Sequence, residues 1–557
     1  MTFSNAAISD MFTLLSKLMD IHQENSFKSK SYSSAAYAID KLSEELQHIQ
    51  REKLFNLKGI GESSAKKIIE ILDSGRMAQL DELIGRTPEG VLEMLQIKGL
   101  GPKKISTIWK EMGIETLGEL LYACNENRLL LYKGFGEKTQ QNVADSIEFY
   151  LRNQGHFLYA EIEEYAHAFQ ETLKKQFTEC TFVLCGEFVR QQPTIETIEW
   201  VTNIQSSILI DFLANNGFVV EFSDDKKIVV RGNENVGLVF NFSTNNDFHK
   251  TVFLLNGSED FINSWKEQYP ASLVQPTSEE DIFKIASVNY IPVCQREEKD
   301  IIQLASKKSL SNTIRTEDIK GIIHSHSDWS DGVNKIDDMA KACINRGFEY
   351  LVISDHSKSA FYANGLSEER IKQQHLFIDE LNKKFSPFKI FKSIESDILN
   401  DGSLDYSPSL LGTFDLVIAS VHSNLKMSEE KAMQRVMTAI ENPYTTILGH
   451  PTGRLLLSRK GYPLDHERII DACIANRVAI EINAHPRRLD LDWRWIRKAQ
   501  EKGAMLSINP DAHNTEGYND IRYGVLAAQK GGLQKNNNLS SLSLAEFEQY
   551  LSNVRRY

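Results

Sequence analysis

The amino-acid sequence predicts a multidomain protein with a helical N-terminal region and a C-terminal region of parallel β-strands joined by helices. Three observations predict this fold class. The chain of 557 residues is longer than one hydrophobic core usually organises. A pattern of apolar residue, glycine, apolar residue, glycine occurs three times in the N-terminal part. Toward the C-terminus, seven short β-branched runs alternate with helical patterns, which is typical of βα units.

Composition and charge exclude several classes of protein. The composition is that of an ordinary globular protein, and the net charge is −13, so any contact with DNA must come from local patches. The six cysteines form no Cys-x-x-Cys pair, which indicates buried thiols in a reducing compartment. No apolar run approaches transmembrane length, and no basic segment precedes an apolar one at the N-terminus. We therefore expect a cytoplasmic protein with no membrane partner.

The N-terminal part begins with amphipathic helical patterns over residues 4–50 and continues with the three glycine motifs. The glycines allow a tight turn, and the helix that follows presents free N–H groups and the positive end of its dipole. One such motif is weak, because helices often turn on glycine, but here a lysine lies just beyond each of three. Helix-hairpin-helix motifs of this kind bind the DNA backbone without reading sequence. The predicted DNA-binding residues are Gly59, Gly61, Lys67, Gly99, Gly101, Lys103, Gly134, Gly136 and Lys138.

Candidate metal ligands follow six of the seven β-branched runs in the C-terminal part. In GIIHSH, for example, His324 and His326 are two residues apart and project to one face of an extended strand. The intervening helical patterns cover residues 335–346, 368–384, 429–441, 466–475 and 492–502. Solvated surface histidines are the alternative, but they would not follow strand ends six times. The predicted ligands, which are also the predicted catalytic residues, are His324, His326, Asp331, His356, Glu395, His422, His450, Asp511 and His513.

These nine side chains exceed what one ion can hold, since a catalytic zinc usually takes about three protein ligands. The set contains imidazole and carboxylate but no thiolate, which suits manganese, zinc or iron. We therefore expect roughly two or three clustered divalent ions, Mn²⁺ or Zn²⁺ or iron, that activate water and stabilise both oxygens of a phosphoryl displacement.

The same residues resemble the motifs of the polymerase and histidinol phosphatase (PHP) superfamily. The resemblance rests on HSH, SDG, SDH, the glutamate of SIESDI, VHS, GHP and PDAH, and covers about Ile319 to Gly532. It implies a distorted (β/α)7 barrel with a trinuclear metal centre, and all nine of the family's ligand positions are filled here.

The part before the barrel, from about Ser4 to Glu298, resembles family X DNA polymerases, whose bacterial members append a PHP domain at the C-terminus. The resemblance implies a lyase-like helical domain, helix-hairpin-helix repeats and an α+β palm of the nucleotidyltransferase type. Lys67 falls at the family's Schiff-base lysine. Its alternative role is that of a lysine facing a DNA phosphate.

The palm departs from the family pattern. The family binds two magnesium ions with three aspartates, and the matching positions here are Thr197, Glu199 and Asn241. The family's triphosphate-binding serine is replaced by Glu187, and its arginine pair reads Val189-Arg190. We therefore expect the nucleotidyl-transfer site to be degenerate.

The predicted domains run in order along the chain. They are residues 1–84 (lyase-like), 85–150 (helix-hairpin-helix), 151–298 (degenerate palm and thumb), 299–318 (linker), 319–535 (PHP barrel) and 536–557 (tail).

The function predicted from the sequence is a metal-dependent phosphoesterase acting on DNA ends, and the resemblance implies 3′→5′ exonuclease action on gapped, nicked or 3′-ended duplex DNA. Arg454 and Arg488 are candidate phosphate-binding residues, with a salt bridge on the barrel rim as the alternative. Three other functions stay open: a small-molecule phosphatase, a working gap-filling polymerase and a non-catalytic DNA-binding scaffold. The three glycine motifs argue against the first, the missing carboxylates against the second, and the complete ligand set against the third.

Overall fold

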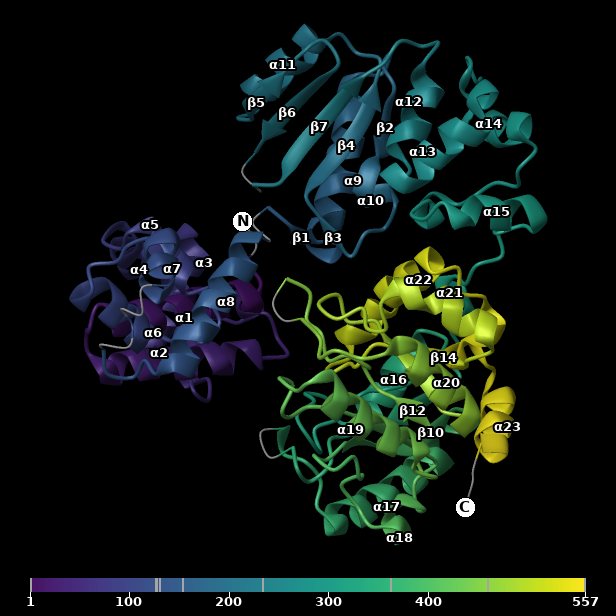
Figure 1. The fold of residues 1–557 in the computed structure, drawn as a ribbon. Helices are drawn as coiled ribbons and strands as arrows, with labels where there is room; N and C mark the ends of the chain where they lie inside the picture. The colour runs from purple at the N-terminus through teal and green to yellow at the C-terminus, as the bar shows by residue number, and fades with distance from the viewer. Residues whose placement is uncertain are drawn as a thin grey trace. The chain divides into compact units, whose positions relative to one another are not determined.

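The computed structural model describes residues 3–125, 129, 132–152, 155–232, 235–360, 363–457 and 460–554 (Figure 1). It divides into two compact units, Met1–Gln154 and Gly155–Tyr557. The first is helical, and the second contains a five-stranded mixed sheet, a seven-stranded parallel sheet and a short two-stranded pair, so the predicted multidomain fold class is confirmed. The finer domain boundaries stay predictions. Leu130 and Leu131, which lead into the third glycine motif, lie outside the described residues.

The first unit is built from short amphipathic helices around one apolar core. Ser4 starts the first helix, because its Oγ accepts a hydrogen bond from the Ala7 amide at 3.2 Å. Ile8, Phe12 and Leu15 of this helix are buried in the core. The helices are α1 (Asn5–Ile21), α2 (Ser26–Asp40), α3 (Glu62–Ser74), α4 (Ala78–Gly85), α5 (Glu89–Met94), α6 (Pro102–Ser106), α7 (Leu117–Asn125) and α8 (Glu137–Arg152).

The three glycine motifs form the turns that lead into α3, α6 and α8. The first glycine of each motif has a left-handed backbone, with φ of 84° at Gly59, 88° at Gly99 and 96° at Gly134. Residues with a Cβ rarely adopt this conformation, so the glycines are required by the turn itself. The second glycine of each motif directly precedes its helix, as the helix-hairpin-helix prediction requires.

The second unit opens with a five-stranded mixed sheet in the order β2-β4-β7-β6-β5. Strand β4 runs parallel to β7, and the remaining pairs are antiparallel. The rings of Trp200 and Phe240 are stacked in the core of this sheet, with their centroids 5.0 Å apart. Its elements are α9 (Tyr159–Gln176), β2 (Phe182–Cys185), α10 (Gly186–Val189), β4 (Thr197–Thr202), α11 (Ser206–Asn215), β5 (Val219–Ser223), β6 (Lys227–Arg231) and β7 (Gly237–Phe242), with a short pair β1 (Phe157–Leu158) and β3 (Thr194–Ile195) beside it.

Helices connect this sheet to the barrel. They are α12 (Phe248–Leu255), α13 (Glu259–Gln268), α14 (Glu279–Ala286) and α15 (Asp300–Lys307). Residues 299–318 were expected to be a polar linker, but they contain α15, whose Ile301, Ile302 and Ala305 are buried. Charged residues surround an apolar stripe at helical spacing in this stretch. That stripe packs in one core with buried side chains of α12, α13 and α14.

The barrel is a sheet of seven parallel strands in the order β14-β13-β12-β11-β10-β9-β8. Helices follow where the sequence predicted them. The strands are β8 (Gly321–Ile322), β9 (Tyr350–Ile353), β10 (Lys389–Asp397), β11 (Leu416–Ser420), β12 (Ile447–Leu448), β13 (Ala479–Asn483) and β14 (Leu506–Asn509). The helices are α16 (Ile336–Asn345), α17 (Glu368–Phe385), α18 (Pro408–Leu411), α19 (Glu429–Glu441), α20 (His466–Asn476), α21 (Trp493–Lys502), α22 (Ile521–Lys530) and α23 (Leu544–Val554).

Two features complete the barrel. Just beyond β8 and β14, Ser325 and Ala512 form a parallel bridge, and the His326 amide donates to the Ala512 carbonyl at 2.8 Å, so the first and last strands meet at their carboxyl ends. The C-terminal helix α23 packs on the apolar barrel interior. Its Phe547 is fully buried and stacks on Tyr350 at 4.6 Å, in one cluster with inward residues of several strands.

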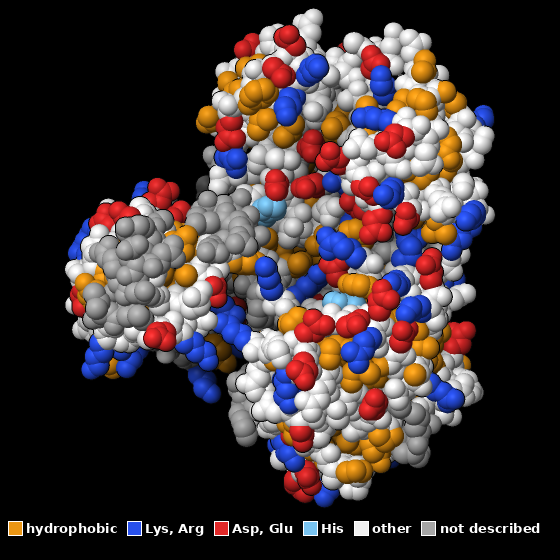
Figure 2. Space-filling model, viewed as in Figure 1, with side chains coloured by type: hydrophobic (Ala, Val, Ile, Leu, Met, Phe, Trp, Pro, Cys, Tyr) orange, Lys and Arg blue, Asp and Glu red, His pale blue; other side chains and the backbone are white. Residues whose placement is uncertain are grey.

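The surface has no single sign of charge. On the face in view, Lys and Arg side chains are interspersed with Asp and Glu (Figure 2). Among the described residues, no helix combines the length and the apolar character needed to cross a membrane.

We expect Phe547→Ala to destabilise the second unit by about 3–5 kcal/mol, because it removes a fully buried ring and leaves a cavity against Tyr350. Urea unfolding followed by circular dichroism measures the loss. Leu376→Ala on α17 is the control, since Leu376 is 67% exposed and its truncation should change stability by about 0.5 kcal/mol or less. Equal unfolding midpoints for the two variants would contradict the role of α23.

Candidate metal centre

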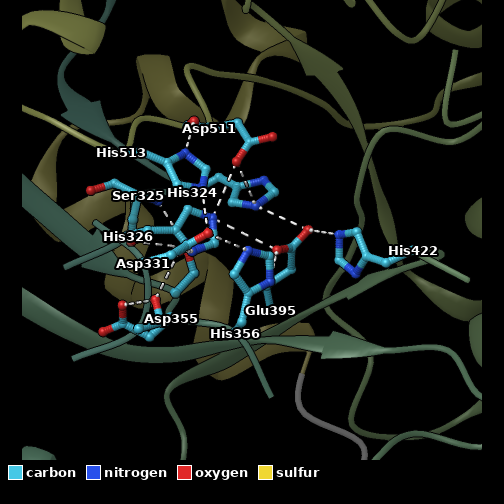
Figure 3. A network of polar contacts seen from close by, with 12 residues as sticks. His324, Ser325, His326, Asp331, Asp355, His356, Glu395, His422, Asp511 and His513 are labelled. Carbon is cyan, nitrogen blue, oxygen red and sulfur yellow. Dashed lines mark hydrogen bonds and ion pairs between the residues drawn. The ribbon is translucent and has the colours of Figure 1, made fainter. Parts of the chain in front are cut away.

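The nine predicted ligands come together at the carboxyl ends of the barrel strands, and Figure 3 labels all of them except His450. They follow β8, β9, β11, β12 and β14 or, for Glu395, lie within β10. Because all strands are parallel, their carboxyl ends share one edge of the sheet, and side chains far apart in the chain meet there.

Glu395 is the centre of this cluster. Its side chain is 1% exposed and is surrounded by imidazoles. Oε1 lies 3.2 Å from Nε2 of His324, 3.1 Å from Nε2 of His422 and 3.0 Å from Nε2 of His450. Oε2 lies 2.9 Å from Nδ1 of His356. One buried carboxylate therefore stands between ring nitrogens delivered by four different strands.

A second group of ligands adjoins it on the side of the last strand. Oδ1 of Asp511 lies 3.1 Å from Nε2 of His326 and 3.5 Å from Nε2 of His324. Oδ2 of Asp331 lies 3.4 Å from Nε2 of His513. Three overlapping sets of side chains bring their ligand atoms within 4.8 Å of one another: His326, Asp331, His356 and His513; His324, His326 and Asp511; and His356, Glu395 and His422.

The residues present fit divalent metal ions. Nε2 of His324, Nδ1 of His326 and Oε2 of Glu395 are buried and make no hydrogen bond among the described residues, and buried polar atoms without partners are rare unless an ion or water satisfies them. The donors are all imidazole nitrogens and carboxylate oxygens, the ligands of zinc, manganese and iron sites.

The backbone at several ligands is strained. His324, His450 and Asp511 have positive φ angles of 64°, 21° and 51°. Residues with a Cβ adopt such angles at an energetic cost, and the cost is tolerated where the surrounding structure requires the conformation. Here it directs three side chains from the strand ends into the shared centre.

A layer of buried polar residues behind the ligands was missed by sequence reasoning. Asp397 accepts a hydrogen bond from Nδ1 of His422. Glu481 on β13 lies 2.6 Å from Nδ1 of His324. Asp355 accepts hydrogen bonds from the Ser327 amide at 2.7 Å and hydroxyl at 2.6 Å, which shapes the turn after His326.

The signals for this layer are present in the sequence. Asp397 lies two residues beyond Glu395 on the same strand, so it projects to the same face. Glu481 is an acidic residue inside the apolar run RVAIEINAH, and a carboxylate in a buried strand requires hydrogen-bond donors around it.

The electrostatics of the centre shift the pKa values of its imidazoles in both directions. Burial and the neighbouring His513 and His356 lower the pKa of His326 to about 4. Burial lowers the pKa of His324, but Glu481, Asp511 and Glu395 outweigh it and raise the pKa well above its usual range. Burial also lowers the pKa of His422, but Glu395 and Asp397 outweigh it and raise the pKa to about 10. The pKa of His513 rises to about 9, because Asp331 and Asp511 outweigh its burial.

The two arginines predicted to bind phosphate differ in their surroundings. Arg454 donates to the backbone carbonyls of Arg488 and Leu489 and pairs with Asp492, so its guanidinium is used within the loop. Arg488 is closer to the centre, with Nε 3.7 Å from Oδ2 of Asp511. Both stay predictions as phosphate contacts, and Arg488 is the better placed.

The predicted DNA-binding lysines lie at the start of α3, α6 and α8 in the first unit. Burial lowers the pKa of Lys67, and its Nζ lies 5.6 Å from the centre of the Tyr32 ring. The neighbouring Lys66 pairs with Glu62 at 2.6 Å, and Lys104 donates to the Gly99 carbonyl at 3.1 Å. The DNA-binding role of Lys67, Lys103 and Lys138 stays a prediction.

The palm positions at which the sequence departs from the family pattern, Thr197, Glu199 and Asn241, lie on β4 and β7. Asn241 is 3.5 Å from Glu199 and also donates to the Trp200 carbonyl at 3.2 Å, and Thr197 stands two residues before Glu199. Burial raises the pKa of Glu199. Arg190, from the altered arginine pair, donates to Glu297 at 3.1 Å. Among the described residues, the candidate groups of three or more metal-binding side chains all lie in the barrel.

Three known domain families match parts of the chain. Residues 3–77 match a helix-hairpin-helix domain, residues 91–148 match a SAM-like helix-hairpin-helix tandem, and residues 323–485 match the PHP domain.

Known proteins resemble the chain in two ways. Over nearly its whole length it is similar to the DNA polymerase/3′-5′ exonuclease PolX of Bacillus subtilis, with 32% identity and coverage of 96% of both chains. Over a smaller part of its length it is similar to probable phosphatases. One is from Caldanaerobacter subterraneus subsp. tengcongensis, with 28% identity over 31% of this chain and 68% of the relative. Another is YcdX of Escherichia coli, with 28% identity over 22% of this chain and 52% of the relative.

Metal binding to the metal-free protein at pH 8 should release about two to three protons per chain, because His324, His422 and His513 have raised pKa values and must lose a proton to bind an ion. The apparent affinity should therefore rise as the pH is raised toward 10 and the competing protons leave. A zinc or manganese titration in weak buffer with a pH indicator counts the protons.

The matched control for proton release is His422→Ala, which should release about one proton fewer. Metal uptake without proton release in the parent protein would show that these imidazoles are neutral in the metal-free state.

Proposed function

The chain belongs to the PolX family of DNA polymerases, the family X members with helix-hairpin-helix domains and a C-terminal PHP domain, and on this premise we propose that it is a DNA-binding, metal-dependent phosphoesterase that trims 3′ ends of DNA. The observation that carries the proposal is the convergence of eight imidazoles and carboxylates, three of them on strained backbone, around a ninth candidate ligand, the buried Glu395. Hydrolysis of a phosphodiester by clustered metal ions requires the ions to be held close together, and a cluster of ligands can do this.

The proposed roles follow from the geometry. Glu395 and the eight side chains around it would hold two or more divalent ions, which when bound supply an activated water and stabilise the charge on a phosphodiester. Arg488 faces the same mouth beside Asp511 and would orient a phosphate oxygen. The glycine motifs of the first unit would hold the DNA backbone.

A DNA substrate is favoured over a small metabolite by the first unit. Two helix-hairpin-helix family models match residues 3–148 apart from a short gap, and a phosphatase for soluble metabolites has no use for them. The small-molecule phosphatase remains the second candidate, supported by the barrel's similarity to probable phosphatases. Salt-dependent binding to duplex DNA separates the two functions.

Loss of polymerase activity is the other part of the proposal. Two magnesium sites need several carboxylates, and the palm has Glu199 with Thr197 and Asn241 at the matching positions. Glu199 is also buried against Gly186, where its Oε1 lies 2.5 Å from the position that a Cβ would take. Arg190, the remaining arginine of the family's pair, forms an ion pair with Glu297.

His324→Ala and His326→Ala should each lower cleavage of a 3′-labelled nicked or gapped duplex at least about a thousandfold, because each removes a ligand from the centre. DNA affinity, measured by fluorescence anisotropy, should change by no more than about twofold. His466→Ala on α20 is the control, since its ring stacks on Trp495 outside the centre. Undiminished cleavage by the His324 variant would place the nuclease elsewhere in the chain.

Primer extension on a gapped duplex should be undetectable with magnesium or manganese at millimolar concentration, because the palm lacks the carboxylates for two ions. The assay follows a 5′-labelled primer in the presence of all four nucleotides, with the His324→Ala variant used so that exonuclease action cannot hide extension. Extension that disappears in Glu199→Gln would show a working palm.

A further inference from the structure

Strand β13 is the one barrel strand that supplies none of the nine expected ligands, yet it places a carboxylate directly behind them. Glu481 lies in the middle of the strand and is 0% exposed. A buried ionised carboxylate is costly unless hydrogen-bond donors surround it. The surroundings of Glu481 therefore indicate what the strand contributes to the centre.

Four donors meet the two oxygens of Glu481. Oε1 accepts from the His450 amide at 3.0 Å and from Nδ2 of Asn483 at 2.9 Å. Oε2 accepts from Nδ2 of Asn509 at 2.8 Å and lies 2.6 Å from Nδ1 of His324. A carboxylate has about four lone-pair sites, so these contacts use all of them. Glu481 has no acceptor left for a metal ion and is not a further ligand.

The contact with Glu481 determines which nitrogen of His324 is free. A carboxylate can only accept, so Nδ1 of His324 carries the hydrogen. In the neutral ring Nε2 then holds the lone pair, and Nε2 is the atom that faces the centre, 3.2 Å from Glu395 and 3.5 Å from Asp511. Carboxylates behind metal-binding histidines orient rings in this way.

The same strand end also orients a second ligand. Nδ2 of Asn483 donates to Oε1 of Glu481 and, at 3.0 Å, to Oδ2 of Asp511. Both acceptors are carboxylates, so the donating atom is the amide nitrogen and both of its hydrogens are used. Glu481 thereby connects His324, the backbone of His450 and, through Asn483, Asp511.

We propose that Glu481 is a positioning residue of the metal centre, which holds His324 with its proton on Nδ1 so that Nε2 binds an ion, and which holds Asp511 in place through Asn483. The proposal rests on the proposed function in one respect, that the centre binds metal. Under this proposal β13, which supplies no ligand itself, holds His324 and Asp511 of other strands in place.

Glu481→Gln tests this role with little change of shape. In either orientation the amide NH₂ faces two donors, either His324 Nδ1 and Asn509 or the His450 amide and Asn483. The clash between these donors is relieved in the first orientation only if the His324 proton moves to Nε2, where it blocks metal binding. In the second orientation it is relieved only if Asn483 moves away from Asp511. We expect the affinity for zinc to fall roughly 10–100-fold.

The measurement is a zinc titration of the metal-free full-length chain against a competing chromophoric chelator. The rise in melting temperature on adding zinc should shrink in the variant by the corresponding amount. A residue with a merely structural role would lower the melting temperature with and without zinc and leave the zinc-induced rise unchanged. Glu441→Gln at the exposed end of α19 is the matched control and should bind zinc like the parent.

A double-mutant cycle separates action through His324 from a general effect on the fold. If Glu481 acts on this ligand, then Glu481→Gln should add little to the loss already caused by His324→Ala, and the double variant should bind zinc about as weakly as the single one. Losses that add in full, or an unchanged affinity in Glu481→Gln, overturn the proposal.

The parent protein provides a test that does not depend on the variant folding. In the zinc-loaded chain labelled with ¹⁵N-histidine, the signal that disappears in His324→Ala should report a protonated Nδ1 and a zinc-bound Nε2. The reverse assignment overturns the proposal. Failure of DNA cleavage with intact zinc affinity would count against the proposed function and leave the role of Glu481 standing.

Discussion

One buried carboxylate surrounded by imidazoles is the interaction on which the rest of the barrel depends. Glu395 is 1% exposed and has ring nitrogens of His324, His356, His422 and His450 within 3.2 Å. In water such charges would be solvated separately, whereas in the barrel they can only neutralise one another or bind cations. The raised pKa of His422, to about 10, and the depressed pKa of Glu395 are two consequences of this enforced proximity.

In the barrel, the polar candidate ligands lie at the carboxyl ends of the strands, and the interior is apolar. At the carboxyl ends of the strands, the bridge between Ser325 and Ala512 joins the first and last strands beside the ligands. The interior is filled by apolar side chains together with Phe547 of the C-terminal helix. A well-packed interior resists rearrangement, so it provides a rigid base for ligands that must be held within tenths of an ångström.

Sequence reasoning predicted which side chains meet at the centre because their signal is local. A histidine or carboxylate directly after a β-branched run is expected at the carboxyl end of a parallel strand. The local sequence alone was enough to predict this position for His356 and His422. The role of Glu481 could not be predicted in the same way, because it depends on Asn509 from the next strand and on His324 from the first. The helix α15 was missed because its apolar stripe is short and lies among charged residues.

A buried charge network joins the palm to the barrel within the second unit. Lys530 of α22 is fully buried and donates to the carbonyl of Arg190 at 2.8 Å and to Glu297 at 2.6 Å, and Arg190 reaches the same carboxylate. Burial lowers the pKa of Lys530 to about 8, and Glu297 partly offsets this. A charge network of this kind is disrupted when one partner is lost, since the remaining charges stay buried. Arg190, which stands in the altered arginine pair of the palm, is thereby held in a network whose third member, Lys530, belongs to the barrel helix α22.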